Sequence, residues 1–195
     1  MQSVSEVKKH RAVWVWISII ILLLGSVPFA RIGVEHIEKQ IYPIRYGEYI
    51  ENEANACSFP PSLIYAVIHT ESHFNPEAVS IADAKGLMQL TDDTYRWARR
   101  RLGESKGDPA DLFNPTTNIH YGVTVLSLLR QSFSNTETML AAYNAGQGRV
   151  HSWLSDPAYS DDGVTLHTIP YEETADYVRR VLRTQKRYQQ IYNIP

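Results

Sequence analysis

One carboxylate stands out because it falls on the apolar side of its own segment. Residues 63–71 read LIYAVIHTE, a mostly apolar run. On a helical wheel of about 100° per residue, Ile68 lies roughly 40° and Val67 roughly −60° from Ile64. Glu71 then lies roughly −20° from Ile64, in the middle of the apolar arc. A glutamate is rarely buried without a partner, because removing a carboxylate from water costs several kcal/mol.

The position of Glu71 has two readings. If the carboxyl is buried, its apolar surroundings and the negative end of the helix dipole both favour the protonated form. A carboxyl that keeps its proton near neutral pH is suited to protonating a glycosidic oxygen. Alternatively, the helix ends there and the side chain already reaches solvent. Periodicity alone does not separate these readings, so it makes Glu71 a candidate acid and no more.

Four separated blocks follow from this glutamate to the last part of the chain. They are ESHFNP at 71–76, GLMQL at 86–90, AAYNAG at 141–146, and IP at 169–170 with ETADYV at 173–178. In order and spacing they resemble the catalytic domain of the soluble lytic murein transglycosylases, which is related in fold to goose-type lysozyme. The resemblance covers roughly residues 58–185, and four blocks in order are far more specific than one Glu-Ser pair.

The resemblance implies a role for each matching residue. Glu71 would be the catalytic acid/base, and Ser80 would lie near an N-acetyl group of the sugar. Hydroxyls and amides would hydrogen-bond the substrate, while a thioether and aromatic rings would cover the apolar faces of the sugars. The implied substrate-binding residues are Ser72, Ser80, Met88, Gln89, Tyr143, Asn144 and Tyr177.

The same resemblance implies a lyase reaction. The bond between N-acetylmuramic acid and N-acetylglucosamine would be cut with formation of a 1,6-anhydro-muramoyl end, and no water would be consumed. A glycosidase that adds water usually needs two carboxylates. Asp83, Asp92 and Asp93 are candidates for a second carboxylate, so a lysozyme-type muramidase is the alternative. A non-catalytic glycan-binding module or secretion-system scaffold is a third hypothesis.

Composition restricts the other classes of ligand. The formal net charge is −2 and the pI is near 6.4, so no overall basic field indicates nucleic acid. Cys57 is the single cysteine, which excludes an internal disulfide and a cysteine metal cluster. His69 and His73 are four residues apart, but no third metal ligand is obvious beside them. We therefore expect no metal and no cofactor, and peptidoglycan glycan strands as the partner.

Helices must position these residues, and the sequence indicates where they lie. No convincing period-2 run predicts a strand. We expect an all-α fold, with a helix-dominated α+β fold as the alternative, in a lysozyme-like domain over residues 44–195. The helix signals comprise a segment from Ile44 towards Cys57, a start at Pro61, a start at Asn114-Pro115, a helix near Thr136 to Tyr143 that stops at Asn144-Ala145-Gly146, and a last helix carrying Tyr177.

The first residues predict a membrane anchor before this domain. A basic cluster over residues 8–11 precedes an uncharged apolar stretch over residues 12–30. Nineteen helical residues at ~1.5 Å each span about 28 Å, close to the hydrocarbon thickness of a bilayer. A signal-peptidase cut after Ala30 would need a small residue where Pro28 stands, so we favour a retained anchor over a cleaved signal peptide.

The positive-inside rule gives this anchor a direction. Residues 1–11 would be cytoplasmic, residues 12–30 would be one N-terminal transmembrane helix, and residues 31–43 would be a stalk. The domain at 44–195 would then lie on the periplasmic or extracytoplasmic side of the inner membrane. We expect the inner membrane, and cell-envelope machinery, as further partners of the chain.

Overall fold

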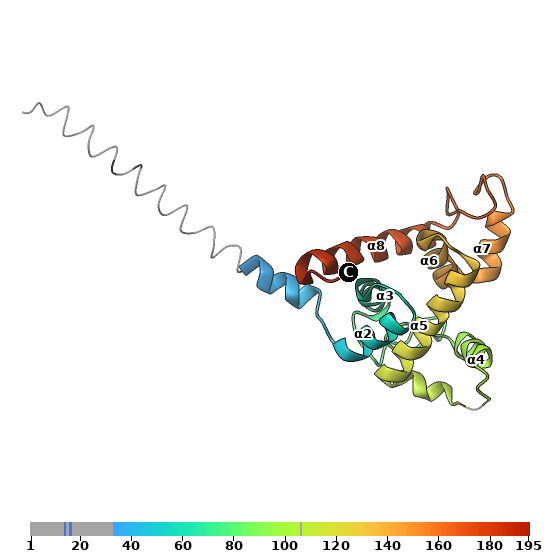
Figure 1. The fold of residues 1–195 in the computed structure, drawn as a ribbon, viewed down its shortest axis with the longest axis horizontal. Coiled ribbons are helices and arrows are strands. Elements are labelled where there is room, and N and C mark those ends of the chain that lie inside the picture. Colours follow the sequence, from blue (N-terminus) through green and yellow to red (C-terminus); the bar gives the residue numbers. More distant parts are fainter. Residues whose placement is uncertain (1–13, 15, 17–32, 106) are drawn as a thin grey trace, which may run out of the picture. The chain divides into compact units, whose positions relative to one another are not determined.

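Helices make up the regular structure of the residues that the computed structural model describes, which are 14, 16, 33–105 and 107–195. Among these residues there is no β-strand, only isolated bridges from Lys85 to Val79 and to Leu90. The predicted all-α fold is therefore confirmed. The elements in Figure 1 are α2 (Gly47–Ala56), α3 (Pro61–Ser72), α4 (Asp92–Arg101), the 3-10 helix η1 (Pro109–Phe113), α5 (Pro115–Ser132), α6 (Thr136–Ala145), α7 (Gln147–Leu154) and α8 (Glu172–Tyr192).

Local signals in the sequence account for several helix boundaries. Pro61 occupies the first turn of α3, where a missing N–H breaks no helical hydrogen bond. Asn114 caps α5, because its side-chain oxygen accepts hydrogen bonds from the backbone N–H groups of Thr116 and Thr117. Gly146 ends α6 with φ 89°, a conformation that L side chains rarely adopt. These helix ends lie where the sequence predicts them.

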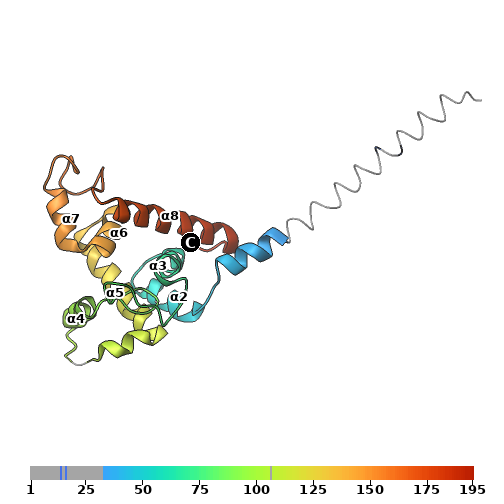
Figure 2. The ribbon, with the colours of Figure 1, turned by 180° about the vertical axis from the view of Figure 1, so that it is seen from behind.

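Helix α3 is the centre of the core, and α8 packs along it. Figures 1 and 2 show these two helices side by side in opposite views. Tyr65 of α3 stacks on Tyr188 of α8 with ring centroids 5.2 Å apart, and both rings are buried. Ile64, Val67 and Ile68 have no exposed surface. Because nearly every side chain of α3 before its last turn is buried, the end of this helix is held rigidly.

Asn118 fastens the segment before α4 to helix α5. It is fully buried, and its side-chain oxygen accepts a hydrogen bond of 2.7 Å from the backbone N–H of Met88. Its amide group donates to the carbonyl oxygens of Lys85 at 2.9 Å and Leu112 at 2.8 Å. One turn later, a Cβ added at Gly122 would lie 2.2 Å from the sulfur of Met88. The glycine therefore permits the close approach of this segment to α5.

The chain before residue 44 is a separate unit. Residues 33–41 are helical, and their side chains are largely exposed. The predicted transmembrane segment at 12–30 lies outside the described residues except for Trp14 and Trp16. Over the part of the chain that is described, no helix combines the length and the apolar character needed to cross a membrane.

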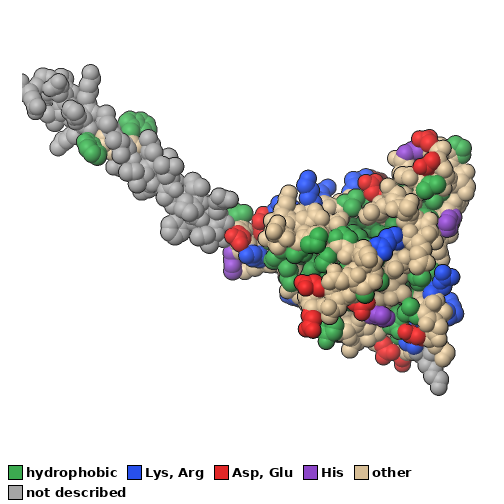
Figure 3. Space-filling view, in the orientation of Figure 1, with side chains coloured by type: hydrophobic (Ala, Val, Ile, Leu, Met, Phe, Trp, Pro, Cys, Tyr) green, Lys and Arg blue, Asp and Glu red, His purple; other side chains and the backbone are tan. Residues whose placement is uncertain are grey.

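The surface of the 44–195 unit carries charges of both signs. Figure 3 shows lysine, arginine, aspartate and glutamate side chains scattered over the face in view, without one dominant basic patch. Some of the basic residues of α4 are paired with neighbours: Arg96 lies near Asp92 and Asp93, and Arg99 is paired with Glu104. The basic run that the sequence shows in this helix is thus partly neutralised.

Candidate active site

A cavity of about 790 Å³ opens beside the last turn of α3. Besides Glu71, its lining comes from the segment before α4, from α4 and α5, from the end of α6 and from the first turn of α8. Glu71 lies in its lining, so the carboxylate nominated by the sequence does reach a pocket. The lining residues are Glu71, Val79, Ser80, Ile81, Ala82, Ala84, Gln89, Leu90, Thr91, Thr94, Val125, Tyr143, Asn144, Ala145, Gly146 and Glu173.

Burial changes the acidity of Glu71. The carboxyl is half-buried, and loss of hydration raises its pKa from 4.5 to about 7. The nearby Tyr177 hydroxyl and the positive charge of Arg180 act in the opposite direction but do not cancel this effect. Both readings of Glu71 describe part of its surroundings: the carboxyl is partly withdrawn from water, and helix α3 ends one residue later, at Ser72. A large fraction of these carboxyls carries a proton near neutral pH.

The backbone turns sharply directly after the glutamate. His73 and Phe74 have φ angles of 50° and 62°, so two successive residues adopt the left-handed conformation. Such residues are uncommon outside glycine and cost conformational energy. Phe74 has no exposed surface and contacts Tyr65 at a centroid distance of 6.3 Å. Burial of the Phe74 ring in the core offsets this strain and fixes the point where α3 stops.

Two tyrosines face the glutamate from other helices. The Tyr143 hydroxyl, from α6, donates a hydrogen bond of 2.8 Å to the backbone carbonyl of Met88. The Tyr177 hydroxyl, from α8, is buried and makes no hydrogen bond of ordinary length with any described group. It nevertheless lies close enough to the Glu71 carboxyl for each group to affect the other's pKa. Burial, followed by the charge of Glu71, raises both tyrosine pKa values well above 10, so both hydroxyls stay protonated.

Ser80, Gln89 and Asn144, for which the sequence predicts substrate binding, line the pocket. The Ser80 hydroxyl accepts a hydrogen bond of 3.1 Å from the backbone N–H of Ala84. The Gln89 amide donates to the carbonyl oxygens of Ala78 at 3.1 Å and Gly86 at 2.9 Å. Since both Gln89 donor bonds are internal, its side-chain oxygen is the group left to accept a hydrogen bond from a ligand.

Ser72 and Met88 do not reach the lining. The Ser72 hydroxyl lies between the carbonyl oxygens of Ile68 at 3.2 Å and Leu87 at 2.8 Å, where it joins α3 to the next segment. The side chain of Met88 has no exposed surface and packs against Gly122. The sequence predicts substrate contacts for both residues, and neither of them is in the lining of this pocket.

None of the three aspartates considered as a second carboxylate lines the Glu71 pocket. Lys85 forms ion pairs of 3.0 Å with Asp83 and 2.6 Å with Asp92. Asp93 has a side chain that is 99% exposed. Glu173, in the first turn of α8, does line the pocket. Sequence reasoning missed it as a second carboxylate, although it begins the ETADYV block.

A second, smaller cavity of about 240 Å³ borders the first one. The two share Thr94, Val125, Tyr143 and Gly146 in their linings, and Trp97 of α4 contributes to the smaller one. The concave surface therefore extends beyond Glu71 along α4 and α6. Within the described ranges, no group of three His, Cys, Asp or Glu side chains is arranged to hold a metal ion.

The sequence of this chain is similar to those of known lytic transglycosylases. The sequence model described as "Transglycosylase SLT domain" matches residues 48–163. The soluble lytic murein transglycosylase of Escherichia coli (strain K12) is 34% identical over 151 residues, which cover 76% of this chain and 23% of that protein. The membrane-bound lytic murein transglycosylase C of Histophilus somni (strain 2336) is 33% identical over 175 residues, covering 76% of this chain and 47% of that protein.

Solved structures show the same arrangement of helices. An inactive variant of the lytic transglycosylase Slt from Pseudomonas aeruginosa superposes with a TM-score of 0.70 at 34% identity, covering 79% of this chain and 25% of that one. A complex of the 70-kDa soluble lytic transglycosylase with bulgecin A gives 0.70 at 29% identity, covering 78% and 25%. This chain thus spans about a quarter of the length of these relatives, and it matches them over most of its own.

Proposed function

Because the chain belongs to the transglycosylase SLT family, we propose that it is a peptidoglycan lytic transglycosylase with Glu71 as its catalytic acid/base. The observation that carries the proposal is a carboxyl with a pKa of about 7 in the lining of a large pocket. The relatives support the substrate, because their names describe them as lytic murein transglycosylases. We propose the glycan strands of peptidoglycan as the substrate of this chain too.

One carboxyl can serve both halves of such a reaction. Glu71 donates its proton to the oxygen between N-acetylmuramic acid and N-acetylglucosamine, and the bond from that oxygen to C1 breaks. The C6 hydroxyl of the same muramoyl sugar then attacks C1, and the Glu71 carboxylate takes the proton of that hydroxyl. The proton balance closes without water. The nucleophile is intramolecular, and its high effective molarity reduces the need for a second carboxylate.

The remaining residues of the site have roles that follow from their positions. Ser80, Gln89 and Asn144 line the pocket and are proposed to hydrogen-bond the amide and hydroxyl groups of the sugars. Tyr143 and Tyr177 keep protonated hydroxyls near Glu71 and are proposed to face the reacting sugar. For Ser72 and Met88 we propose a supporting role, because their side chains hold the wall of the pocket together.

Hydrolysis by a lysozyme-type muramidase is the second candidate, favoured by one observation. Glu173 lines the same pocket as Glu71, and two carboxylates at one site are what hydrolysis usually requires. If Glu173 activates water, replacing it with glutamine abolishes cleavage. If the reaction is the lyase, Glu173→Gln leaves the chemical outcome unchanged and the products keep their anhydro ends.

For the whole chain we propose a single-pass protein of the inner membrane. Residues 1–11 are cytoplasmic, residues 12–30 form the transmembrane helix and residues 31–43 a stalk. The catalytic domain at 44–195 then lies on the periplasmic side, where peptidoglycan is. The charge asymmetry of the sequence supports this layout, and so does the relative named as membrane-bound. An anchored enzyme would also be available to cell-envelope machinery.

Product masses decide the reaction. Purified full-length protein is incubated with isolated peptidoglycan, and the soluble muropeptides are weighed by mass spectrometry. The lyase gives products about 18 Da lighter than those of hydrolysis, since no water is added. Reducing muramic ends would contradict the lyase proposal. Cleavage that persists at the normal rate in Glu71→Gln would contradict the assignment of the acid, because this variant keeps the shape and removes the proton.

A further inference from the structure

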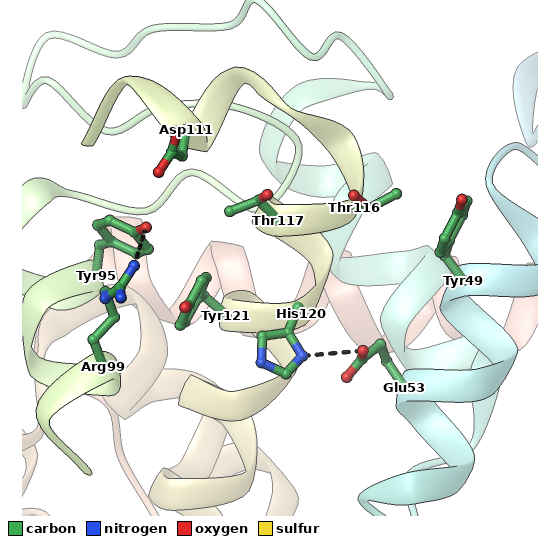
Figure 4. Close-up of a pocket in the computed structure, with 9 residues that line it drawn as sticks. All are labelled: Tyr49, Glu53, Tyr95, Arg99, Asp111, Thr116, Thr117, His120 and Tyr121. Carbon is green, nitrogen blue, oxygen red and sulfur yellow. Dashed lines mark hydrogen bonds and ion pairs between the residues drawn. The ribbon is translucent and has the colours of Figure 1, made fainter. Parts of the chain in front are cut away.

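A second concave site lies away from Glu71, and Figure 4 shows its side chains. It has a volume of about 450 Å³, is open to solvent, and is lined by residues of α2, α4, η1 and the first turns of α5. None of its lining residues belongs to the lining of the Glu71 pocket. The residues are Tyr49, Glu53, Tyr95, Arg99, Asp111, Thr116, Thr117, His120 and Tyr121.

One side of this cavity is a rigid group of two rings and an arginine. The Arg99 guanidinium donates to the Tyr95 hydroxyl at 2.9 Å and pairs with Glu104 at 3.3 Å. It also lies 5.4 Å from the ring centre of Tyr95 and 5.7 Å from that of Tyr121. The Tyr121 hydroxyl donates to Glu104 at 2.5 Å. Both rings are almost fully buried, so this side is fixed before any ligand arrives.

The other side combines hydrogen-bonding groups with an exposed ring. His120 of α5 and Glu53 of α2 are joined at 3.0 Å, as the dashed line in Figure 4 marks. Tyr49, one turn before Glu53, is 51% exposed. Thr117 presents a hydroxyl that makes no hydrogen bond within the described residues. Its backbone N–H donates a hydrogen bond to the side-chain oxygen of Asn114. The cavity thus offers the exposed Tyr49 ring beside the Thr117 hydroxyl and the paired His120 and Glu53.

We propose that this cavity is a second, non-catalytic saccharide-binding site that holds an N-acetylated sugar of the glycan strand. The exposed Tyr49 ring is suited to pack on the apolar face of a sugar ring, while hydroxyl, imidazole and carboxylate groups can bind the sugar hydroxyls and amide. A strongly anionic ligand fits poorly, because Glu104 already neutralises Arg99 and Glu53 and Asp111 add negative charge. The choice of an N-acetylated sugar depends on the proposed function, whereas the site itself depends only on this geometry.

Helix α5 connects the two sites. Thr117, His120 and Tyr121 line the second cavity, and Val125, one turn after Tyr121, lines the Glu71 pocket. Two saccharide sites on one rigid helix allow one enzyme to hold a strand at two places. Binding at the second site then raises the local concentration of glycan at the first. The site therefore retains the enzyme on its polymeric substrate between cuts.

The test uses the full chain in mild detergent with the Glu71→Gln substitution, which prevents turnover. The probe is tetra-N-acetylchitotetraose, and amide hydrogen exchange read by mass spectrometry maps where it protects the backbone. We expect protection in peptides covering residues 47–56 and 109–121, in addition to those around the Glu71 pocket. Tyr49→Ala and Thr117→Val should remove protection at the second site only and weaken calorimetric binding there by about tenfold each.

A matched control separates a local effect from a general one. Asn52→Ala alters an exposed residue of the same helix that does not line the cavity, and it should leave all protection unchanged. Protection confined to the Glu71 pocket would overturn the second site and leave the proposed function standing. If Tyr49→Ala and Thr117→Val kept the same protection at the second site as the parent Glu71→Gln protein, that result would also overturn it. Protection at neither site would contradict the saccharide class for both.

Discussion

At the scale of single residues, the proposed chemistry depends on the proton of the Glu71 carboxyl. Burial holds the pKa of Glu71 at about 7, although Tyr177 and Arg180 both oppose that shift. The carboxyl can therefore donate a proton and take one back at the same pH, which is what a single acid/base requires. Three measurements test the raised pKa of Glu71: the pH profile of activity, the effect of removing the Tyr177 hydroxyl, and the pH dependence of stability.

The first measurement is the pH profile of activity. The free enzyme must hold the Glu71 proton to begin the reaction, so kcat/KM should be level below pH about 7 and should fall about tenfold per pH unit above it. Release of soluble muropeptides at low substrate concentration gives this profile. A descending limb that starts near pH 5 would show that Glu71 has an ordinary pKa and would contradict the proposal.

The second measurement removes the Tyr177 hydroxyl. This hydroxyl lowers the pKa of Glu71, so Tyr177→Phe should move the descending limb of kcat/KM to higher pH and should also reduce kcat. Tyr65→Phe is the matched control, because Tyr65 also has a buried hydroxyl without a hydrogen-bond partner. The control should leave the limb in place. Equal profiles for both variants would mean that Tyr177 does not interact with the acid.

The third measurement is the stability of the protein as a function of pH. The pKa of Glu71 is raised in the folded state, so the folded chain binds more protons than the unfolded chain between pH 4.5 and about 7. The Glu71 contribution is therefore fully present below pH 4.5 and is lost as pH rises towards 7, by up to roughly 3 kcal/mol. Glu71→Gln should remove this loss, so denaturant unfolding should find the variant more stable than wild type at pH 8 but not at pH 4.

At the scale of elements, Asn118 holds three parts of the chain around the site. Replacing it with leucine leaves the Met88 N–H and two carbonyl oxygens without their buried partner. We expect a loss of about 2–4 kcal/mol in the free energy of unfolding. We also expect a fall in kcat, because the backbone carbonyl of Met88 accepts the hydrogen bond that holds the Tyr143 hydroxyl. Thermal unfolding and muropeptide release measure the two effects.

Asn114→Ala provides the comparison within the same helix. It removes the cap of α5, which costs about 1 kcal/mol, but it breaks no contact with the segment around Met88. Activity at a temperature where the variant is folded should therefore be close to that of wild type. If Asn118→Leu loses no more activity than Asn114→Ala, the hydrogen bonds of Asn118 are structural only.

The elements also show what the sequence could predict and what it could not. Pro61 and Gly146 act through their own backbone and Asn114 through a side-chain cap on the next residues, so these helix ends could be predicted from local sequence. Helix α7, which begins directly after Gly146, and η1 were not expected, because their signals are short. The positions of Ser72 and Met88 depend on residues far along the chain. The motifs imply a substrate role for both, but the side chains are placed by the hydrogen bond from Ser72 to the Leu87 carbonyl oxygen and by the packing of Met88 against Gly122.

At the scale of the whole molecule, the proposed anchor at residues 12–30 would determine where the enzyme works. Full-length protein expressed in bacteria should sediment with membranes and resist alkaline carbonate extraction. A chain that starts at residue 31 should be recovered in the soluble fraction. Its release of muropeptides from isolated peptidoglycan should stay within about twofold of wild type, because the catalytic unit begins at residue 44. Full-length protein in the soluble fraction would contradict the anchor.

The contact between Gly122 and Met88 limits the order in which this sequence can change. A larger residue at 122 collides with the sulfur, Cβ and Cε of Met88. The backbone carbonyl of Met88 also accepts the hydrogen bond from the Tyr143 hydroxyl, so a shift of Met88 would disturb that bond. A mutation at 122 is tolerable only after position 88 has become smaller, and a smaller residue at 88 alone leaves a void. Neither single step is neutral. Positions 88 and 122 are therefore expected to change together in evolution or to stay as they are. A mutagenesis library should vary both positions at once.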